Sequence, residues 1–457
     1  MKQIKVGYTE GKVGRKLLFN SLPMVIGIGA AIAFNFIDTV FVAKLGTTEL
    51  AAIGFTFPVI FLIVGVAMGL GQGSSAVISK AYGEGDTYKV KRLTTDSLIL
   101  ALLAVAFFTT IGFIFMDDIF KLMGAGSDTM PHIQDYMVVW YSGVIFLVVP
   151  MVGNANIRAI GDTKYPSMLM LLAIGINLIF DPLLIFGLGP FPRLEIAGAA
   201  YATLIARFFT LTASILLLTK KYDMITLKRC SFSDILLSWK EILNVGLPSA
   251  LTSIIVPLGY SIIVRFVSEF GKEAVAALTA ASRVETLALT VFMALASVLG
   301  PFIGQNWGAK KTDRIFRALK LSYLFSIAWG ILMIVFFYTM GEFVAKIVED
   351  NELVIQYMVL YFGILSLVGA FRGITMISTT TFNVLKKPIT SASINVSQMF
   401  ILFIPLALYL SDSMGLEGIF WASFASVILT SGVAYFWLNS YLKNLFEPSN
   451  IEYAKSN

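Results

Sequence analysis

The chain is poor in cysteine, in histidine and in charge. Among its 457 residues there is one cysteine, Cys230, and one histidine, His132. One cysteine excludes an internal disulfide, and one histidine excludes a histidine-rich metal site. Charged residues make up 14% of the chain, whereas soluble proteins have about 25%. No Gly-Lys-Ser or Gly-Lys-Thr Walker motif is present, so ATP drive is unsupported. An intramembrane enzyme needs a nucleophile with a base, or a metal cluster. The single cysteine and the single histidine disfavour both.

Hydrophobic residues take the place of the missing polar ones. They make up 57% of the chain, and the mean hydropathy is +0.82. Apolar runs of about 20 residues, each able to cross about 30 Å of hydrocarbon, recur along the whole length. They predict an all-α polytopic membrane protein without a cleavable signal peptide. A β-barrel would instead show alternating segments of about 10 residues. The twelve predicted transmembrane helices are 15–43, 48–80, 93–115, 128–158, 165–188, 197–219, 238–269, 273–306, 314–338, 351–382, 388–410 and 416–442.

The distribution of positive charge predicts the orientation in the membrane. Of the 34 Lys and Arg residues, 25 fall in the termini and the loops on the same side, 5 in the opposite loops and 4 within spans. Cytoplasmic loops are enriched in Lys and Arg. We therefore expect a multi-pass protein of the plasma (inner) membrane with both termini in the cytoplasm. This orientation also explains the net charge of +6 without a nucleic-acid partner.

The two halves of the sequence resemble each other at an offset of about 225 residues. Leu22-Pro23 aligns with Leu247-Pro248, and Gly46 aligns with Gly271. Each half holds six predicted spans, so the sequence predicts two parallel six-helix repeats of the same orientation, with substrate bound between them. The predicted domains are an N-lobe with the cation site at 1–219, a cytoplasmic connector at 220–237, a C-lobe at 238–442 and a cytoplasmic tail at 443–457.

Two acids lie within predicted spans of the first half. A carboxylate at membrane depth is costly and indicates a functional site. Asp38 and Asp181 lie at similar predicted depth, and the repeat aligns them with Ile263 and Ile404, so this chemistry belongs to one half. The predicted cation-coupling patch is Asp38, Asp181, Asn177, Thr203, Tyr136 and Asn35. Two nearby carboxyl groups titrate as a coupled pair and suit H⁺, while the same oxygens suit Na⁺. The alternative is structural: Asp38 caps a helix, and Asp181 serves a kink at Pro182.

Glu285 is the third acid within a predicted span. It lies two residues from Arg283, so the two side chains point to different faces of the helix. We expect Glu285 to pair with another helix, which favours a structural role for it. Arg283, Glu285 and Arg265 are the candidate structural or substrate contacts of the C-lobe. The run Gly69-Leu70-Gly71-Gln72-Gly73 is similar to a dinucleotide turn but follows no strand, so it predicts close helix packing.

Short motifs along the whole chain resemble those of the multidrug and toxic compound extrusion (MATE) family. Their order and spacing carry the resemblance, since no single motif is decisive. They are Phe36-Ile37-Asp38-Thr39-Val40, Ala81-Tyr82-Gly83-Glu84-Gly85, Arg158-Ala159-Ile160-Gly161-Asp162, Asn177 with Asp181-Pro182, Gly198 to Thr203, Ser282-Arg283-Val284-Glu285 and Gly304-Gln305-Asn306-Trp307-Gly308.

The resemblance implies a MATE-like fold and efflux of amphipathic, often cationic drugs in exchange for H⁺ or Na⁺. It implies no cofactor, and a functional monomer among membrane lipids. Within the family the chain is most similar to the DinF-like branch, in which the equivalents of Asp38, Asn177, Asp181 and Thr203 form the cation site. The NorM-like branch relies on acids in its seventh and tenth helices. In this chain the matching stretch of the seventh predicted helix, Leu251–Tyr260, contains no acid. The alternative function is a lipid or lipid-linked oligosaccharide flippase of the same superfamily, which the intramembrane arginines keep open.

Overall fold

The structure, a computed structural model, describes residues 7–43, 47–228 and 231–446, with the backbone alone described at 35–40, 42–43, 47–51 and 256. Within these residues the secondary structure is helical, without strands. Twelve helices or runs of helices in this part of the chain are long and apolar enough to cross a membrane. The predicted fold class, an all-α polytopic membrane protein with twelve spans, is confirmed.

In the described part of the chain, nine of the twelve spans are single helices and three are runs of consecutive helical elements. They are α1 (Val13–Ala43), α2 (Thr47–Glu84), α3 (Thr87–Ile114), α5 (Met130–Ala159), α6 (Lys164–Phe186), α7 (Glu195–Leu216) continuing into η1 (Leu217–Lys221), α8 (Phe232–Ser268), α9 (Lys272–Gly308), α10 (Thr312–Val348), α11 (Glu352–Leu365) with η2 (Ser366–Val368) and α12 (Gly369–Val384), α13 (Pro388–Val396) with η3 (Ser397–Phe403) and α14 (Ile404–Met414), and α15 (Leu416–Phe446).

Two predicted helix bounds are wrong for a local reason, and one short helix was not predicted. A capping box of Ser231 and Asp234 starts α8 at Phe232, six residues before the predicted start. The span predicted to end at 338 continues as α10 to Val348, and Glu342 and Lys346 pair across its last turns at 2.6 Å. The short helix α4 (Met116–Leu122) lies between α3 and α5, and two aspartates in its first turn complement the helix dipole.

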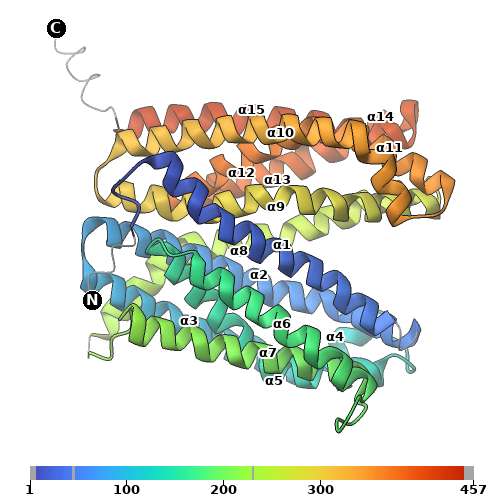
Figure 1. Cartoon of the computed structure of the whole chain (residues 1–457), viewed down its shortest axis with the longest axis horizontal. Coiled ribbons are helices and arrows are strands. Elements are labelled where there is room, and N and C mark those ends of the chain that lie inside the picture. Colours follow the sequence, from blue (N-terminus) through green and yellow to red (C-terminus); the bar gives the residue numbers. More distant parts are fainter. Residues whose placement is uncertain (1–6, 44–46, 229–230, 447–457) are drawn as a thin grey trace.

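The twelve spans form two halves that approach each other at one end. In Figure 1 the first half (blue to green) lies below the second (yellow to red), and the halves diverge toward the right. Helix α1 begins and helix α15 ends at the left-hand end of the picture. We refer to this end as the terminal side, and to the other end as the opposite side.

Two helices that correspond in the repeat each contact both halves. Helix α1 begins against the second half, where Val13 and Leu17 join a core formed mainly by α9 and α10, and it packs along α6 farther on. Helix α8 begins against the first half, where Ile242 joins the core of α2, α3 and α5. The interface therefore includes two equivalent helix pairs, α1 with α9 and α2 with α8, together with the direct packing of α2 against α9. This arrangement is what two parallel repeats related by an axis along the membrane normal produce.

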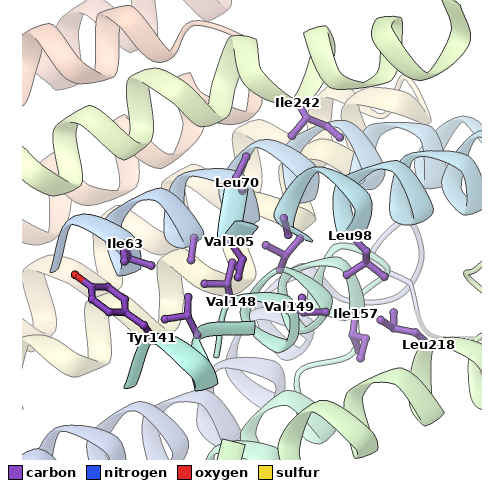
Figure 2. Packing of buried hydrophobic residues seen from close by; sticks show 14 of the residues in the cluster. Ile63, Leu70, Leu98, Val105, Tyr141, Val148, Val149, Ile157, Leu218 and Ile242 are labelled. Carbon is purple, nitrogen blue, oxygen red and sulfur yellow. The ribbon is translucent and has the colours of Figure 1, made fainter. Parts of the chain in front are cut away.

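The core of the first half is a continuous set of buried aliphatic side chains. Figure 2 shows Leu70 of α2, Val105 of α3 and Val148 of α5 within this cluster. Leu218 joins it from η1, and its side chain is fully buried. Burial of one such side chain contributes about 1.5–3 kcal/mol where the alternative is water. Because lipid is equally apolar, close packing holds these helices together in the membrane.

Glycines allow the two halves to touch backbone to backbone near the terminal side. A Cβ atom at Gly69 or Gly73 would overlap the carbonyl oxygens of Gly246 or Ile242 on α8. Such small residues let membrane helices approach closely. The prediction that the run from Gly69 to Gly73 serves helix packing is confirmed. Nearer the terminal side, a Cβ atom at Gly83 would overlap the carbonyl oxygen of Gln305 on α9.

We expect Gly83→Ala to separate the halves on the terminal side, because the added methyl group has no space against Gln305. The measurement is the distance between spin labels at Glu84 and Lys310, which are exposed near the ends of α2 and α9, in a Cys230→Ser background. A shift to longer distances is expected. The control is Gly54→Ala on the same helix, where a Cβ atom would meet nothing within 4 Å. Equal distributions for both variants would contradict the packing argument.

Candidate functional site

The predicted cation patch of the first half has two buried members on α6. Asp181 is 0% exposed and Asn177 is 3% exposed. Since they are four residues apart on a helix, their side chains share one face. The Oδ1 atom of Asn177 is buried and has no hydrogen-bond partner among the described residues. An unsatisfied buried polar atom costs about 1–3 kcal/mol. An oxygen acceptor held beside a buried carboxyl group is suited to receive a proton donor or a cation.

The remaining members of the predicted patch lie on neighbouring helices. Thr203 on α7 and Tyr136 on α5 are partly exposed, and α7 packs against both α5 and α6. The side chains of Asn35 and Asp38 lie outside the described residues, although α1, which carries them, packs along α6. The structure therefore packs α7 between α5 and α6, so the helices that carry Tyr136, Thr203 and Asp181 are neighbours. It leaves the pairing of Asp38 with Asp181 as a prediction.

Arg207 belongs to the first half, one helical turn beyond Thr203 on the same face of α7. Its Nε atom is buried without a hydrogen-bond partner in the described part of the chain. The first half thus holds an arginine as well as acids in its interior. The predicted patch, which consists of oxygen and amide groups, does not include this arginine.

A second polar cluster lies within the second half. Glu285 on α9, which is 5% exposed, accepts hydrogen bonds through Oε2 from the Tyr361 hydroxyl at 2.7 Å and from Arg372 Nη1 at 3.1 Å. These groups come from α9, α11 and α12, so Glu285 does pair with other helices. Beside them, the hydroxyl groups of Tyr260 and Ser282 lie 3.0 Å apart and join α8 to α9.

The ion pair of the second half is only partly enclosed. The side chain of Arg372 is 28% exposed, whereas that of Glu285 is 6% exposed. Arg283 and Arg265 occupy exposed positions on α9 and α8, away from the buried carboxylate. An arginine guanidinium offers five donors in a planar fork that matches carboxylate and phosphate groups. The second half can therefore present donors to an anionic group while Glu285 neutralises one of its charges.

The halves are joined on the terminal side by a hydrogen-bond network around Gln305. Its Oε1 accepts from the backbone N–H of Tyr8 at 2.7 Å, and its Nε2 donates to the carbonyl of Ala159 at 2.8 Å. Gln305 is fully buried. Arg314 Nη2 donates to the carbonyl of Tyr8 at 2.7 Å, and Asn306 Nδ2 donates to the same carbonyl at 3.3 Å. The segment before α1 is thereby fastened to α9 and α10, and α9 is fastened to the end of α5.

Asp162 organises the same end of the first half. Its carboxylate accepts from the Tyr222 hydroxyl at 2.6 Å and from the backbone N–H of Lys164 at 3.0 Å. Burial raises the pKa of Tyr222 well above its usual range, and the hydrogen bond to Asp162 raises it further. The pKa of Tyr8 is raised in the same way, first by burial and then by Asp162. Both phenols therefore stay neutral at physiological pH.

The sequence motifs contained a signal for this terminal-side network, although its residues are not part of the predicted sites. Gln305 and Asn306 belong to the motif at 304–308, and Asp162 belongs to the motif that begins at Arg158. Tyr361 and Tyr260 gave no signal, because the chain has 17 tyrosines and neither follows a motif. Their positions beside Glu285 depend on how three helices pack.

Comparison with known proteins places this architecture in a family. The MatE family model matches the chain twice, at residues 23–183 and at residues 248–409. The two matches repeat at an offset of 225 residues, as the two halves do. The chain therefore belongs to the MatE family, and it is a membrane transporter and not an enzyme.

Several relatives cover nearly the whole chain. A protein named FAD transporter from Shewanella oneidensis is 38% identical over 432 residues, which are 94% of this chain and 95% of that protein. A probable multidrug resistance protein of Bacillus subtilis, YoeA, is 27% identical over 67% of each chain. The multidrug export protein MepA of Staphylococcus aureus strain MRSA252 is 23% identical over 92% of this chain and 93% of that protein.

Solved structures of MATE transporters share the fold. A mutant of the Vibrio cholerae MATE transporter VcmN superposes with a TM-score of 0.90 and 26% identity, over 94% of this chain and 97% of that one. The same transporter in its bent form gives a TM-score of 0.89 and 26% identity, over 95% and 98%. The MATE-like fold predicted from the motifs is confirmed.

Proposed function

We propose that this protein is a secondary antiporter of the plasma (inner) membrane, with both termini in the cytoplasm, that exports its substrate in exchange for H⁺ or Na⁺. The observation that carries the proposal is the buried pair on α6, Asp181 with the unsatisfied Oδ1 of Asn177. A carboxyl group in hydrocarbon is too costly to be kept without use. The coupling ion enters at Asp181, Asn177 and Thr203 together with Asp38, and the assignment to the DinF-like branch rests on the same residues.

We propose that the structure represents the outward-facing state. Its halves touch at Gly73 and Gly83 and at the Gln305 network, all of which lie toward the terminal side. Figure 1 has them diverging toward the opposite side. The excess of Lys and Arg on the terminal side favours the cytoplasm for that side. Cation binding at Asp181 then releases substrate outward, because a ligand shifts an equilibrium through its different affinities for the two states.

The substrate that we favour is FAD or a closely related flavin nucleotide. The relative named FAD transporter is 38% identical over 94% of this chain, whereas the multidrug relatives above are 23–27% identical. The pyrophosphate of FAD is anionic, and arginine binds phosphate with paired hydrogen bonds. Arg372, Arg283 and Arg265 supply such donors in the second half, and its tyrosines offer faces on which flat rings stack.

The second candidate is efflux of amphipathic, cationic drugs, as the family resemblance predicts. It is favoured by Glu285, whose buried carboxylate would attract a cation if Arg372 moved away from it. The two candidates differ in the charge of the substrate, so they separate cleanly in transport assays.

The experiment is transport into proteoliposomes, with pH and Na⁺ gradients imposed separately. FAD and ethidium, both fluorescent, serve as the anionic and cationic probes. We expect gradient-driven accumulation of FAD at a rate at least tenfold above that of ethidium. Ethidium transport without FAD transport would replace the flavin proposal with drug efflux. Lipid scrambling without transport of either probe would favour the flippase alternative.

A further inference from the structure

A groove on the outer surface of the first half is lined almost entirely by apolar residues. It lies between α6 and the run of α7 and η1, and its volume is about 1010 Å³. This volume is at the upper end of the range for small-molecule sites, about 300–1,000 Å³. Along α6 the lining extends from Tyr165 to Ile179, a rise of about 21 Å, and its aliphatic part from Met168 to Ile179 rises about 16 Å. One leaflet of the hydrocarbon core has a similar thickness, about 15 Å.

The groove faces away from the candidate cation site. Its α6 lining includes Leu172, Gly175 and Ile179, whose positions are half-exposed or exposed. Asn177 and Asp181 lie on the buried face of the same helix. The groove is therefore separate from the coupling chemistry and opens where lipid surrounds the protein.

Two lysines, Lys220 and Lys221, line the end of the groove nearest the terminal side. The residues that line the groove include no Asp or Glu. The Nζ atom of Lys221 lies 3.1 Å from the centre of the Tyr165 ring and 5.2 Å from that of Tyr222. Aromatic faces attract cations, so the two rings hold Lys221 in place. Lys220 is exposed and has no ion-pair partner among the described residues.

The carboxylates of Asp162 and Asp223 already have partners within the protein. Asp162 accepts from the Tyr222 hydroxyl at 2.6 Å, and Asp223 pairs with Lys91 at 2.5 Å. The hydrogen bond from Lys91 lowers the pKa of Asp223, so that carboxylate stays ionised and paired. The positive charge of the two groove lysines is thus left without an ion-pair partner among the described residues, at the terminal-side end of the span formed by α7 and η1.

We propose that this groove binds a phospholipid with an anionic headgroup. The phosphate lies between Lys220 and Lys221, and an acyl chain follows α6 past Leu172 and Gly175 toward Ile179. The length of the apolar lining and the two lysines together favour this ligand. A neutral lipid would leave the charges of the lysines without a counter-charge. A soluble anion would leave the apolar lining without a contact. The proposal does not depend on the transported substrate.

The test is a native mass-spectrometry titration of the purified full-length protein with phosphatidylglycerol and with phosphatidylcholine. The wild type is expected to retain phosphatidylglycerol preferentially. The variant Lys220→Gln/Lys221→Gln is expected to bind phosphatidylglycerol about tenfold more weakly, since basic residues near the surface each add to the attraction of anionic lipid. Its weak affinity for phosphatidylcholine is expected to stay unchanged.

A second variant tests the apolar part without changing charge. A Cβ atom at Gly175 meets nothing within 4 Å, so Gly175→Phe fits and fills the groove. It is expected to displace phosphatidylglycerol as strongly as the lysine variant. The control is Lys240→Gln/Lys320→Gln, two exposed lysines outside the groove, which is expected to bind like the wild type. Unchanged binding in either groove variant, or full competition by soluble glycerophosphate, would overturn the proposal.

Discussion

Asp181→Asn is expected to abolish gradient-driven FAD transport, lowering the initial rate at least tenfold, while FAD binding by the purified protein stays within twofold of the wild type. Asparagine has nearly the same shape as aspartate, and the site is fully buried, so packing is preserved. What is lost is the group that takes up and releases charge. The measurements are FAD fluorescence in proteoliposomes under imposed pH and Na⁺ gradients, and FAD binding in detergent.

The matched control for this substitution is Asp135→Asn. Asp135 lies in the same half on α5 and is exposed. We expect its transport rate and its melting temperature to equal those of the wild type. If Asp181→Asn folds and still transports FAD at the full gradient-driven rate, coupling through α6 is wrong. A rate lost together with FAD binding would instead assign Asp181 to the substrate site.

Glu285→Gln is expected to destabilise the second half strongly. It leaves Arg372 without its carboxylate in a largely buried position, where Oε2 of Glu285 now lies 3.1 Å from Nη1. Breaking a buried ion pair from one side costs about 3–5 kcal/mol, much of it for the charge that remains. The double variant Glu285→Gln/Arg372→Gln is expected to recover most of this loss. The measurement is the melting temperature of the purified protein in detergent.

An exposed ion pair supplies the control for the buried one. Glu342 and Lys346 on α10 lie 2.6 Å apart, with side chains 67% and 60% exposed. Exposed pairs contribute little, so Glu342→Gln is expected to leave the melting temperature unchanged. If Glu285→Gln behaves like Glu342→Gln, the pair is not a structural element of the second half. If the double variant is no more stable than the single one, the unpaired charge is not the cause.

The polar network on the terminal side bears on the proposed transport cycle. In that cycle, the switch from the outward-facing to an inward-facing state releases Gln305 from Ala159 and from Tyr8. Each hydrogen bond contributes about 0.5–1.5 kcal/mol, and buried groups left unpaired cost more. To shift a two-state equilibrium from 1:99 to 99:1, a ligand must favour one state by about 5.5 kcal/mol. In the proposed cycle, cation binding at Asp181 and substrate binding in the second half together supply a difference of this order.

The sequence predicted the fold well because membrane helices follow from composition. Apolar runs of about 20 residues form helices in hydrocarbon, because a helix satisfies its backbone hydrogen bonds within the segment. The six-span repeat determined how the two halves are related. The predicted bounds fail where a helix extends beyond the apolar run, as α10 does with Glu342 and Lys346. There the helix continues through charged residues, which a search for apolar runs does not detect.

The candidate site could be predicted only in part. Asp181 and Asn177 were detectable because a carboxylate in an apolar run is rare and a spacing of four defines one helix face. The partner of Glu285 was not, because Arg372 is 87 residues away and meets it through the packing of α9 with α11 and α12. The role of Gln305 was hidden for the same reason, since it bonds Tyr8 from 297 residues away.

The most direct test of coupling through the first half is ion movement driven by FAD alone. Proteoliposomes loaded with FAD are diluted into FAD-free buffer without an imposed ion gradient, and internal pH and Na⁺ are recorded with fluorescent indicators. Wild-type protein is predicted to move H⁺ or Na⁺ inward as FAD leaves, and Asp181→Asn is predicted to move neither ion. FAD efflux from wild-type liposomes without movement of either ion, or equal ion movement in Asp181→Asn, would contradict the account.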